Sequence, residues 1–497
     1  MDDRQKQTPF FTKLREYALS HPIPFDVPGH KLGRLPNDME DFVGEHTFLL
    51  DSNAPLGLDT LSKPTGVIKE AEKLLAEACN ADKAYFLTNG TTVGILAMIM
   101  ASVRAKEKII MPRNVHKSAI NALILSGAMP VFIKPDIDVE LGIANGVSVR
   151  SVKKAIDANP DAKAILIINP TYFGMTSDLI EIVKLAHDHD MLVLVDEAHG
   201  SQFYFSSRLP YTAMEAGADI SASSMHKTAG SLTQSSMLLT KGDRVDHIRL
   251  RSTLNMLQST SPSSLLIASI DVARKTMYFE GEERIGKIID LAHKYRQKIK
   301  TISGLHIVDK DYVVKRGGID FDETKLVIKV SELGLTGFEV LKELRRRYNI
   351  QLELAESHII LAVLTAGTTP EDLEALYLAL KDLSKKYFRI RKKLPKIDFG
   401  YQFPETYSRP REAYHAPKLC VPLADAAGEI SAESVMIYPP GIPMVIPGEI
   451  ISKDVVDDIE FYINNGSTIH SDLDNGYIKI VDRVHWEKYE GEDSDEF

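Results

Sequence analysis

The chain has 497 residues, of which 44% are hydrophobic and 26% are charged, and its formal net charge at pH 7 is −10. This is the composition of an ordinary globular protein, and it excludes a disordered or fibrous chain. The length suffices for roughly two to four domains, and the acidic balance without a basic stripe argues against nucleic acid as a partner.

The cysteine content and the N-terminal residues indicate the compartment. Only two cysteines are present, Cys79 and Cys420, which excludes a disulfide framework and fits a reducing environment. The chain begins with polar residues, unlike a signal peptide, and it has no apolar run near the roughly 20 residues of a membrane span. We therefore expect a cytoplasmic protein that is neither exported nor inserted in a membrane.

The first part of the chain is predicted to be an arm followed by a large α/β domain. Residues 1–60 are often interrupted by Pro and Gly and are expected to form an irregular arm with short helices. Over residues 61–300 short apolar strands alternate with helices, which predicts a mainly parallel sheet with helices on both faces. The predicted strands are residues 84–87, 108–111, 164–168 and 191–195, and the predicted helices are residues 94–103 and 118–125.

A smaller α/β domain is predicted over residues 301–395. A helix over residues 281–301, with apolar residues at helical spacing, connects it to the large domain. The basic stretch 389–393 marks a linker, and the Pro-rich residues 396–497 form a C-terminal segment. The predicted elements of the small domain are strands over 326–330 and 359–364, a helix over 337–348, and a helix that follows the N-cap Thr369 and Pro370.

The motif Thr88-Asn89-Gly90-Thr91-Thr92 lies between a predicted strand and an apolar helix. A small polar turn that opens a helix offers free backbone N–H groups and the positive end of the helix dipole, which suits a phosphate. The alternative is a plain helix N-cap.

A predicted strand that starts at Met191 ends in the carboxylates of Asp196 and Glu197. Ligands of open α/β sheets bind at the carboxyl ends of the strands. A carboxylate that leaves a dry strand requires a cationic partner, and a protonated pyridine nitrogen would serve. The alternatives are an aspartate that caps the next turn and a ligand of a divalent metal; because no further Asp/Glu cluster accompanies it, no metal site is predicted.

Lys227 follows Ser224 and His226 in a run of small residues. A lysine whose pKa is lowered becomes a nucleophile toward carbonyls, and the two preceding side chains can donate to a phosphate. The alternative is a surface lysine on a loop.

His116 lies in the motif Pro112-Arg113-Asn114-Val115-His116-Lys117-Ser118, which follows another predicted strand. An imidazole at this edge of the sheet would be able to stack on an aromatic cofactor. The alternative is a histidine of the core or of a helix N-cap.

Together these motifs resemble the prokaryotic ornithine/lysine/arginine decarboxylases, fold-type-I enzymes that depend on pyridoxal 5′-phosphate (PLP) and are related to aspartate aminotransferase. The resemblance implies an aspartate aminotransferase-like large domain with a smaller C-terminal domain. Further matching motifs are Pro28-Gly29-His30-Lys31, Asn169-Pro170-Thr171-Tyr172, Asp196-Glu197-Ala198-His199-Gly200, Thr260-Ser261-Pro262-Ser263, Tyr438-Pro439-Pro440-Gly441-Ile442-Pro443 and Pro447-Gly448-Glu449.

The resemblance also implies roles for single residues. Lys227 matches the Schiff-base lysine and Asp196 the partner of the pyridine nitrogen, and His199 or the freed Lys227 would protonate the substrate Cα. The remaining cofactor contacts implied are His116 and Ala198 on the two ring faces, Gly90, Thr91, Ser224 and His226 on the phosphate, and Thr260 and Ser261 on the phosphate of the neighbouring subunit.

The implied reaction is decarboxylation of a basic amino acid. With only about 60 residues before the PLP domain, the chain resembles the short biosynthetic subgroup. This subgroup converts L-arginine to agmatine and CO2 in polyamine biosynthesis, so we expect the same reaction here. The resemblance also implies a homodimer or higher homo-oligomer with active sites at the subunit interface. The alternatives are a lysine or ornithine decarboxylase, another fold-type-I enzyme such as an aminotransferase, and a catalytically silent relative that regulates a partner.

Overall fold

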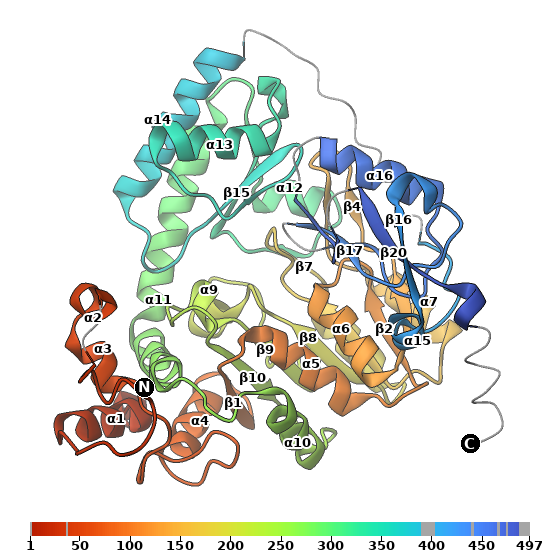
Figure 1. The fold of residues 1–497 in the computed structure, drawn as a ribbon. Helices are drawn as coiled ribbons and strands as arrows, with labels where there is room; N and C mark the ends of the chain where they lie inside the picture. Colours follow the sequence, from red (N-terminus) through yellow and green to blue (C-terminus); the bar gives the residue numbers. More distant parts are fainter. Residues whose placement is uncertain are drawn as a thin grey trace, which may run out of the picture.

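The computed structural model describes residues 2–35, 38–388, 403–438, 442–464, 468–473 and 476–486. It shows an N-terminal arm, a large domain, a small domain and a C-terminal segment (Figure 1). The predicted linker 389–393, and Pro439, Pro440 and Gly441 of one family motif, lie outside the described residues. Within these ranges, none of the helices combines the length and the apolar character that a membrane crossing requires.

The N-terminal arm packs on the large domain through its longest helix, α1. Phe10 and Leu14 of α1 are buried in the core of the large domain. The backbone N–H of Phe10 donates to the Asp271 carboxylate at 3.0 Å, which fastens the helix start. The helices of the arm are η1 (Asp3–Lys6), α1 (Pro9–Leu19), α2 (Asp38–Val43) and α3 (Glu45–Leu50).

A seven-stranded sheet lies at the centre of the large domain, in the order β1-β10-β9-β8-β6-β2-β3. Neighbouring strands from β9 to β3 are parallel, whereas β10 is antiparallel to both β1 and β9. The mainly parallel sheet predicted from the sequence is therefore confirmed. Its strands are β1 (Lys83–Leu87), β2 (Lys108–Pro112), β3 (Met129–Ile133), β6 (Ala164–Ile168), β8 (Leu192–Asp196), β9 (Ile220–Ser223) and β10 (Ser236–Thr240).

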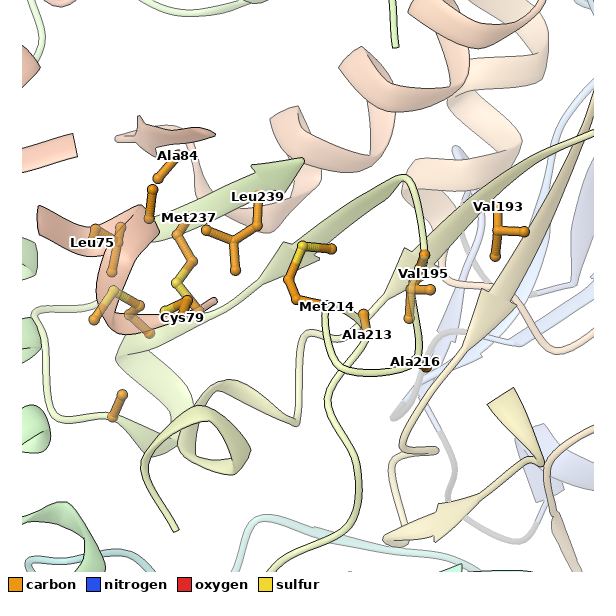
Figure 2. Close-up of a cluster of buried hydrophobic side chains, with 14 of the residues drawn as sticks. Leu75, Cys79, Ala84, Val193, Val195, Ala213, Met214, Ala216, Met237 and Leu239 are labelled. Atoms are coloured by element: carbon orange, nitrogen blue, oxygen red, sulfur yellow. The ribbon is translucent and has the colours of Figure 1, made fainter. Parts of the chain in front are cut away.

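The central strands are buried on both faces, which explains their unbroken apolar runs. Val193 and Val195 of β8 belong to one hydrophobic cluster, and Leu194 between them belongs to another, because successive side chains point to opposite faces. Figure 2 shows part of the first cluster, with Leu75 and Cys79 beside the strand residues Ala84 and Met237. The first cluster includes side chains of α4 (Val67–Ala78), α7 (Val149–Ala158) and α8 (Leu179–His187), and the second those of α5 (Gly90–Ser102), α6 (Lys117–Ser126) and α10 (His247–Leu257).

One helix, α11 (Ser264–Lys300), connects the two domains and is 37 residues long (Figure 1). It confirms the predicted connecting helix but begins at Ser264 rather than at residue 281. The reason is that its first half is enclosed by the arm and the large domain. Asp271 and Arg274 are fully buried there and form an ion pair at 2.8 Å, so the apolar residues do not form the single stripe of a surface helix.

The small domain is built on a four-stranded antiparallel sheet in the order β11-β13-β15-β14. The helix predicted over residues 337–348 is observed with these bounds, and Thr369 caps the next helix by accepting a hydrogen bond from the backbone N–H of Asp372. The elements of this domain are β11 (His306–Ile307), α12 (Lys310–Lys315), β12 (Asp320–Phe321), β13 (Lys325–Lys329), η3 (Ser331–Leu333), α13 (Gly337–Tyr348), β14 (Leu354–Ala355), β15 (Ile359–Val363) and α14 (Pro370–Tyr387).

Short strands complete the fold between and beyond the domains. β12 of the small domain pairs with β7 (Met175–Thr176) of the large domain in a separate two-stranded antiparallel sheet, which joins the two domains. The remaining elements are β4 (Ile137–Asp138), β5 (Ile143–Ala144), η2 (Ser201–Phe205), α9 (Met225–Thr228), α15 (Pro410–His415), β16 (Lys418–Pro422), η4 (Leu423–Asp425), β17 (Val435–Tyr438), β18 (Ile442–Val445), α16 (Lys453–Asn464), β19 (Thr468–His470) and β20 (Tyr477–Val481).

Candidate active site

A cavity of about 430 Å³ opens at the carboxyl edge of the large sheet. Five strands of the sheet end at it, and each contributes residues that lie at its end or shortly after it, as expected for an open α/β sheet. These lining residues are Asn89, Gly90, Thr91 and Thr92 after β1, Asn114 and His116 after β2, Pro170, Thr171 and Tyr172 after β6, Asp196, Ala198 and His199 at the end of β8, and Ser224, His226 and Lys227 after β9.

One wall of the cavity is formed by the start of α5 and by hydroxyl groups. Asn89, the N-cap of α5, makes no side-chain cap hydrogen bond. The backbone N–H of Gly90 donates to the carbonyl of Gln234 at 2.9 Å, and those of Thr91 and Thr92 in the same turn remain available to a ligand. The Thr91 hydroxyl lies 2.5 Å from the Ser224 hydroxyl and 2.9 Å from that of Ser236. This wall therefore presents hydrogen-bond donors in the arrangement that a phosphate requires.

His226 lies beside the same wall. Its Nδ1 donates to the backbone carbonyl of Ser235 at 2.8 Å, which leaves Nε2 as the second ring nitrogen at the cavity. Burial lowers the pKa of His226.

Asp196 is the one acidic residue among the described residues that line the cavity. Asp196 is 8% exposed, and its Oδ1 accepts a hydrogen bond from the backbone N–H of Ala198 at 3.2 Å. Burial raises the pKa of Asp196, and the nearby His116 and Lys227 oppose that shift. Among the described residues, no Lys, Arg or His nitrogen lies within 4.0 Å of this carboxylate, so it is a buried acid without a direct cationic partner.

His116 is both the N-cap of α6 and a lining residue of the cavity. Its Nδ1 accepts the backbone N–H of Ser118 at 3.2 Å, so the N-cap alternative weighed from the sequence is observed. Burial lowers the pKa of His116, and the negative charge of Asp196 acts in the opposite direction. The ring is thus oriented by its own helix start while it faces the cavity.

The amine of Lys227 is held by aromatic side chains. Its Nζ lies 2.9 Å from Nε2 of His199 and 5.3 Å from the centre of the Tyr172 ring. The Tyr172 ring lies against the imidazole of His199, with 4.0 Å between the ring centres. Burial lowers the pKa of Lys227, which favours the neutral, nucleophilic amine.

Of the residues predicted from the sequence, Thr260 and Ser261 are the two that do not line this cavity within the described chain. Both are exposed, in the turn between α10 and α11. Ser261 accepts a weak hydrogen bond from Asn53 at 3.4 Å, and the neighbouring Ser259 N–H points at Asn89, which does line the cavity. Their predicted contact is with a neighbouring subunit, so it remains a prediction.

Three residues with contacts at the site were given no role from the sequence, although Tyr172 lies in one of the matching motifs. Tyr172 covers His199, and its hydroxyl donates to the Glu353 carboxylate of the small domain at 3.0 Å. Lys325 is completely buried on the far side of His199. The sequence shows that Lys325 directly precedes the apolar run 326–330, which hints at a buried lysine. It does not show the contact with His199, which is 126 positions away.

The donor set fits PLP. Phosphate donors line one wall, a reactive amine lies beside an imidazole, and a buried carboxylate without a direct cationic partner would match a protonated pyridine nitrogen. A carboxylate in this environment is costly unless a cation meets it.

Comparisons with known proteins agree with this assignment. A family model described as "Orn/Lys/Arg decarboxylase, major domain" matches residues 8–372, and one described as the C-terminal domain of the same family matches residues 398–469. Arginine decarboxylase of Bacillus subtilis is 42% identical over 95% of this chain and 96% of its own, and that of Halalkalibacterium halodurans is 44% identical over 90% and 92%.

Among solved structures, the lysine decarboxylase LdcF of Francisella novicida superposes with a TM-score of 0.83 at 22% identity, over 96% of this chain and 82% of its own. At that identity the likeness shows the fold alone, and it confirms the predicted fold class. Because the family models together span most of the chain and the relatives exceed 40% identity, the chain belongs to the Orn/Lys/Arg decarboxylase family.

Proposed function

We propose that this protein is a PLP-dependent decarboxylase that converts L-arginine to agmatine and CO2. The observation that supports it most is that the Lys227 amine and the Asp196 carboxylate line one cavity together with a wall of phosphate donors. The choice of arginine rests on the relatives at 42% and 44% identity, which are arginine decarboxylases. A lysine or ornithine decarboxylase is the second candidate, since the family includes all three.

Bound PLP supplies an electron sink for the pair of electrons released when the bond to the substrate α-carboxylate breaks. In this proposal Lys227 holds the cofactor covalently between turnovers, and Asp196 keeps the pyridine nitrogen protonated. His116 and Ala198 lie on the ring faces, and Gly90, Thr91, Ser224 and His226 hold the phosphate.

The proton that replaces the carboxylate is delivered by His199 or Lys227. The two nitrogens are 2.9 Å apart, so a proton held by one is within reach of the other. Burial holds the pKa of His199 well below its usual range, so the ring is neutral at pH 7 and carries a single proton. His199 is 5% exposed, which limits access of water to its ring.

A homodimer or higher homo-oligomer is part of the proposal. Large apolar side chains are highly exposed on the arm, namely Phe25 at 94%, Phe42 at 92% and Leu56 at 103%. Soluble monomers rarely leave such groups uncovered together. The exposed Thr260 and Ser261 would then be free to approach the phosphate held by a neighbouring subunit. Sedimentation of the purified protein tests this: a Phe25→Ser/Phe42→Ser variant is expected to dissociate, and a monomeric parent protein at micromolar concentration would refute it.

A cytoplasmic location and a place in polyamine biosynthesis complete the proposal. They rest on the low cysteine content and on the product expected from arginine.

The direct test is to incubate the purified protein and PLP separately with L-arginine, L-lysine and L-ornithine and to identify the products. Agmatine and CO2 from arginine are expected, whereas cadaverine or putrescine would select the second candidate. Formation of a keto acid would instead indicate an aminotransferase, and protein that stays colourless with PLP would indicate a silent relative.

Lys227→Ala is the matched variant for this test. It is expected to abolish turnover and the visible absorbance that remains after dialysis, because the covalent attachment is lost. Lys287→Ala serves as the control, since this lysine is on the outer surface of α11 with a side chain that is 69% exposed. Turnover that survives Lys227→Ala would overturn the proposal.

A further inference from the structure

His199 lies between two lysines, one on each ring nitrogen. Its Nε2 lies 2.9 Å from the Lys227 amine in the cavity, and its Nδ1 lies 3.5 Å from the amine of Lys325 on the opposite side. Lys325 is the first residue of β13 in the small domain and is 0% exposed. A fully buried lysine with a histidine nitrogen as its neighbour is costly to place and therefore calls for an explanation.

The turn between β12 and β13 fixes the position of Lys325 behind His199. The backbone N–H of Asp322 donates to the carbonyl of Gly174 at 2.8 Å, and the Thr324 hydroxyl accepts from Gln202 at 2.7 Å, so the turn is tied to the large domain at two points. A Cβ at Gly174 would lie 2.9 Å from Cγ of Lys325, so the lysine stem runs directly over this glycine.

Buried carboxylate charge accompanies Lys325. Asp322 is fully buried three residues earlier, and its Oδ1 accepts two hydrogen bonds from Thr324, at 2.6 and 3.0 Å. Its Oδ2 is buried without a hydrogen-bond partner in the described part of the chain. Burial lowers the pKa of Lys325, and Asp322 is the strongest influence that favours its charged form. Burial raises the pKa of Asp322 as well, and the Lys325 amine opposes that shift.

An ammonium group has three donors and no acceptor, whereas a neutral imidazole has one N–H and one lone pair. The His199 nitrogen that faces Lys325 must therefore be the one with the lone pair, because an N–H directed at a positive charge 3.5 Å away would be repelled. The single proton is left on the other nitrogen. The positive charge of Lys325 repels an N–H on the facing nitrogen at 3.5 Å even without a short hydrogen bond between the two groups.

We propose that Lys325 is a positioning residue that fixes His199 in the tautomer with its proton on Nε2, directed at Lys227. With the proton on Nε2, His199 donates a hydrogen bond to the Lys227 amine. The lone pair of the amine is then directed at His199, and the amine is kept unprotonated. The small domain thereby sets the hydrogen-bond direction at the large domain's catalytic lysine. The tautomer itself does not depend on the proposed reaction; only its effect on turnover rests on the proposed function.

The tautomer can be measured on cofactor-free protein. The protein is labelled with 15N in its histidine rings, and the spectrum of His199→Gln is subtracted to identify the signals of His199 among the 15 histidines. The expected result is a proton-bearing Nε2 and an unprotonated Nδ1. A proton on Nδ1 in the parent protein would refute the proposal without any Lys325 variant, and independently of whether the protein decarboxylates arginine.

Lys325→Met removes the charge at nearly constant length, and Lys325→Arg restores a group that only donates. The Met variant is expected to lose the Nε2 preference and the Arg variant to regain it. An unchanged pattern in the Met variant, with its circular dichroism intact, would also refute the proposal. If the Met variant does not fold, the parent spectrum decides.

A second readout is the pH profile of the PLP-loaded enzyme. Among the described residues, the titratable groups that face His199 are Lys227 and His226 from α9, Lys325 from β13, His116 at the N-cap of α6, and Tyr172, whose hydroxyl donates to Glu353. Loss of the Lys325 charge makes protonation of His199 easier, so the acidic limb of the kcat profile is expected to move to higher pH in the Met variant. We also expect a loss of kcat of roughly a hundredfold at neutral pH, with partial recovery in the Arg variant. A purely structural role would lower activity without moving the limb.

Discussion

Arg113 and Glu449 form a doubly hydrogen-bonded ion pair in the protein interior, although 336 residues separate them. The guanidinium nitrogens lie 2.5 and 2.8 Å from the two carboxylate oxygens, and the side chains are 2% and 1% exposed. Arg113 directly follows β2, three residues before His116, so the pair fastens the C-terminal segment beside the cavity.

Loss of one partner of this pair is expected to destabilise the protein strongly. Glu449→Gln leaves the Arg113 charge buried without its counter-ion, which costs about 3–5 kcal/mol. The C-terminal segment contains the only tryptophan, Trp486, so its fluorescence during urea unfolding reports this loss. A double variant, Arg113→Met/Glu449→Met, is expected to be more stable than Glu449→Gln, because no isolated charge remains.

The control for this experiment is an exposed ion pair in the same segment. Lys479 and Asp472 lie 2.9 Å apart with side chains that are 25% and 51% exposed. Asp472→Asn is expected to cost about 1 kcal/mol or less. An equal effect of Glu449→Gln and Asp472→Asn would contradict the importance of the buried pair.

Asp196→Asn tests the proposed partner of the pyridine nitrogen. The amide keeps the size of the carboxylate but removes its charge, so the protonated form of the cofactor ring loses its stabilisation and kcat is expected to fall about 100- to 1000-fold. Lys227 is unchanged, so the visible absorbance of bound PLP persists. Steady-state kinetics and an absorbance spectrum of the same sample check both points, and near-normal kcat would remove Asp196 from its role.

Ser224→Ala is expected to weaken PLP binding roughly tenfold or more, because one hydrogen bond to a charged phosphate is lost. Equilibrium dialysis against PLP measures this directly. Ser236→Ala is the matched control: its hydroxyl also bonds Thr91, at 2.9 Å, but Ser236 does not line the described cavity. Similar losses in the two variants would mean that the Thr91 rotamer, and not a direct contact of Ser224, determines the affinity.

Glu356 makes the stability of the small domain depend on pH. The residue is 9% exposed, and burial raises the pKa of its carboxyl to about 8. In the unfolded chain the pKa is about 4.3, so between these values the folded state holds a proton that the unfolded state has lost. Stability therefore falls as the pH rises from about 4.3 to 8.

Glu356→Gln removes this titration. The difference in unfolding free energy between the variant and the parent protein is expected to shift by about 4 kcal/mol in favour of the variant from pH 5 to pH 8.5. Urea unfolding followed by circular dichroism at both pH values checks this. Glu70→Gln, on the exposed side of α4, is the control and is expected to change stability by less than about 0.5 kcal/mol at either pH. A pH-independent effect of Glu356→Gln would contradict the assignment.

Much of the fold could be predicted because its signals are local. The run 191–195 reads as a strand buried on both faces, and the helix over 337–348 is marked by a capping Thr336 and an amphipathic pattern. The start of α11 could not be predicted in this way. Whether Asp271 and Arg274 lie inside the protein depends on the arm, whose residues Gln5 and Phe10 contact them from the other end of the chain.

The same distinction holds for the cavity. Asp196, Lys227 and His116 could be proposed because each lies at or shortly after the end of a strand, and the carboxyl ends of neighbouring strands meet at one edge. Lys325 could not, because a lysine at the start of a strand is usually in contact with solvent. Its contact with His199 joins residues that are 126 positions apart, and it exists only because the small domain is held against the large one.

The long helix α11 has a mechanical consequence. At a rise of about 1.5 Å per residue it is a rod of roughly 55 Å, and its buried residues are shared between the cores of both domains, such as Ile270 in one and Ala292 in the other. Unfolding of either domain exposes the buried residues on its half of α11. The two domains of the intact protein are therefore expected to unfold in one transition. Protease cleavage near the middle of α11 would destabilise both hydrophobic cores.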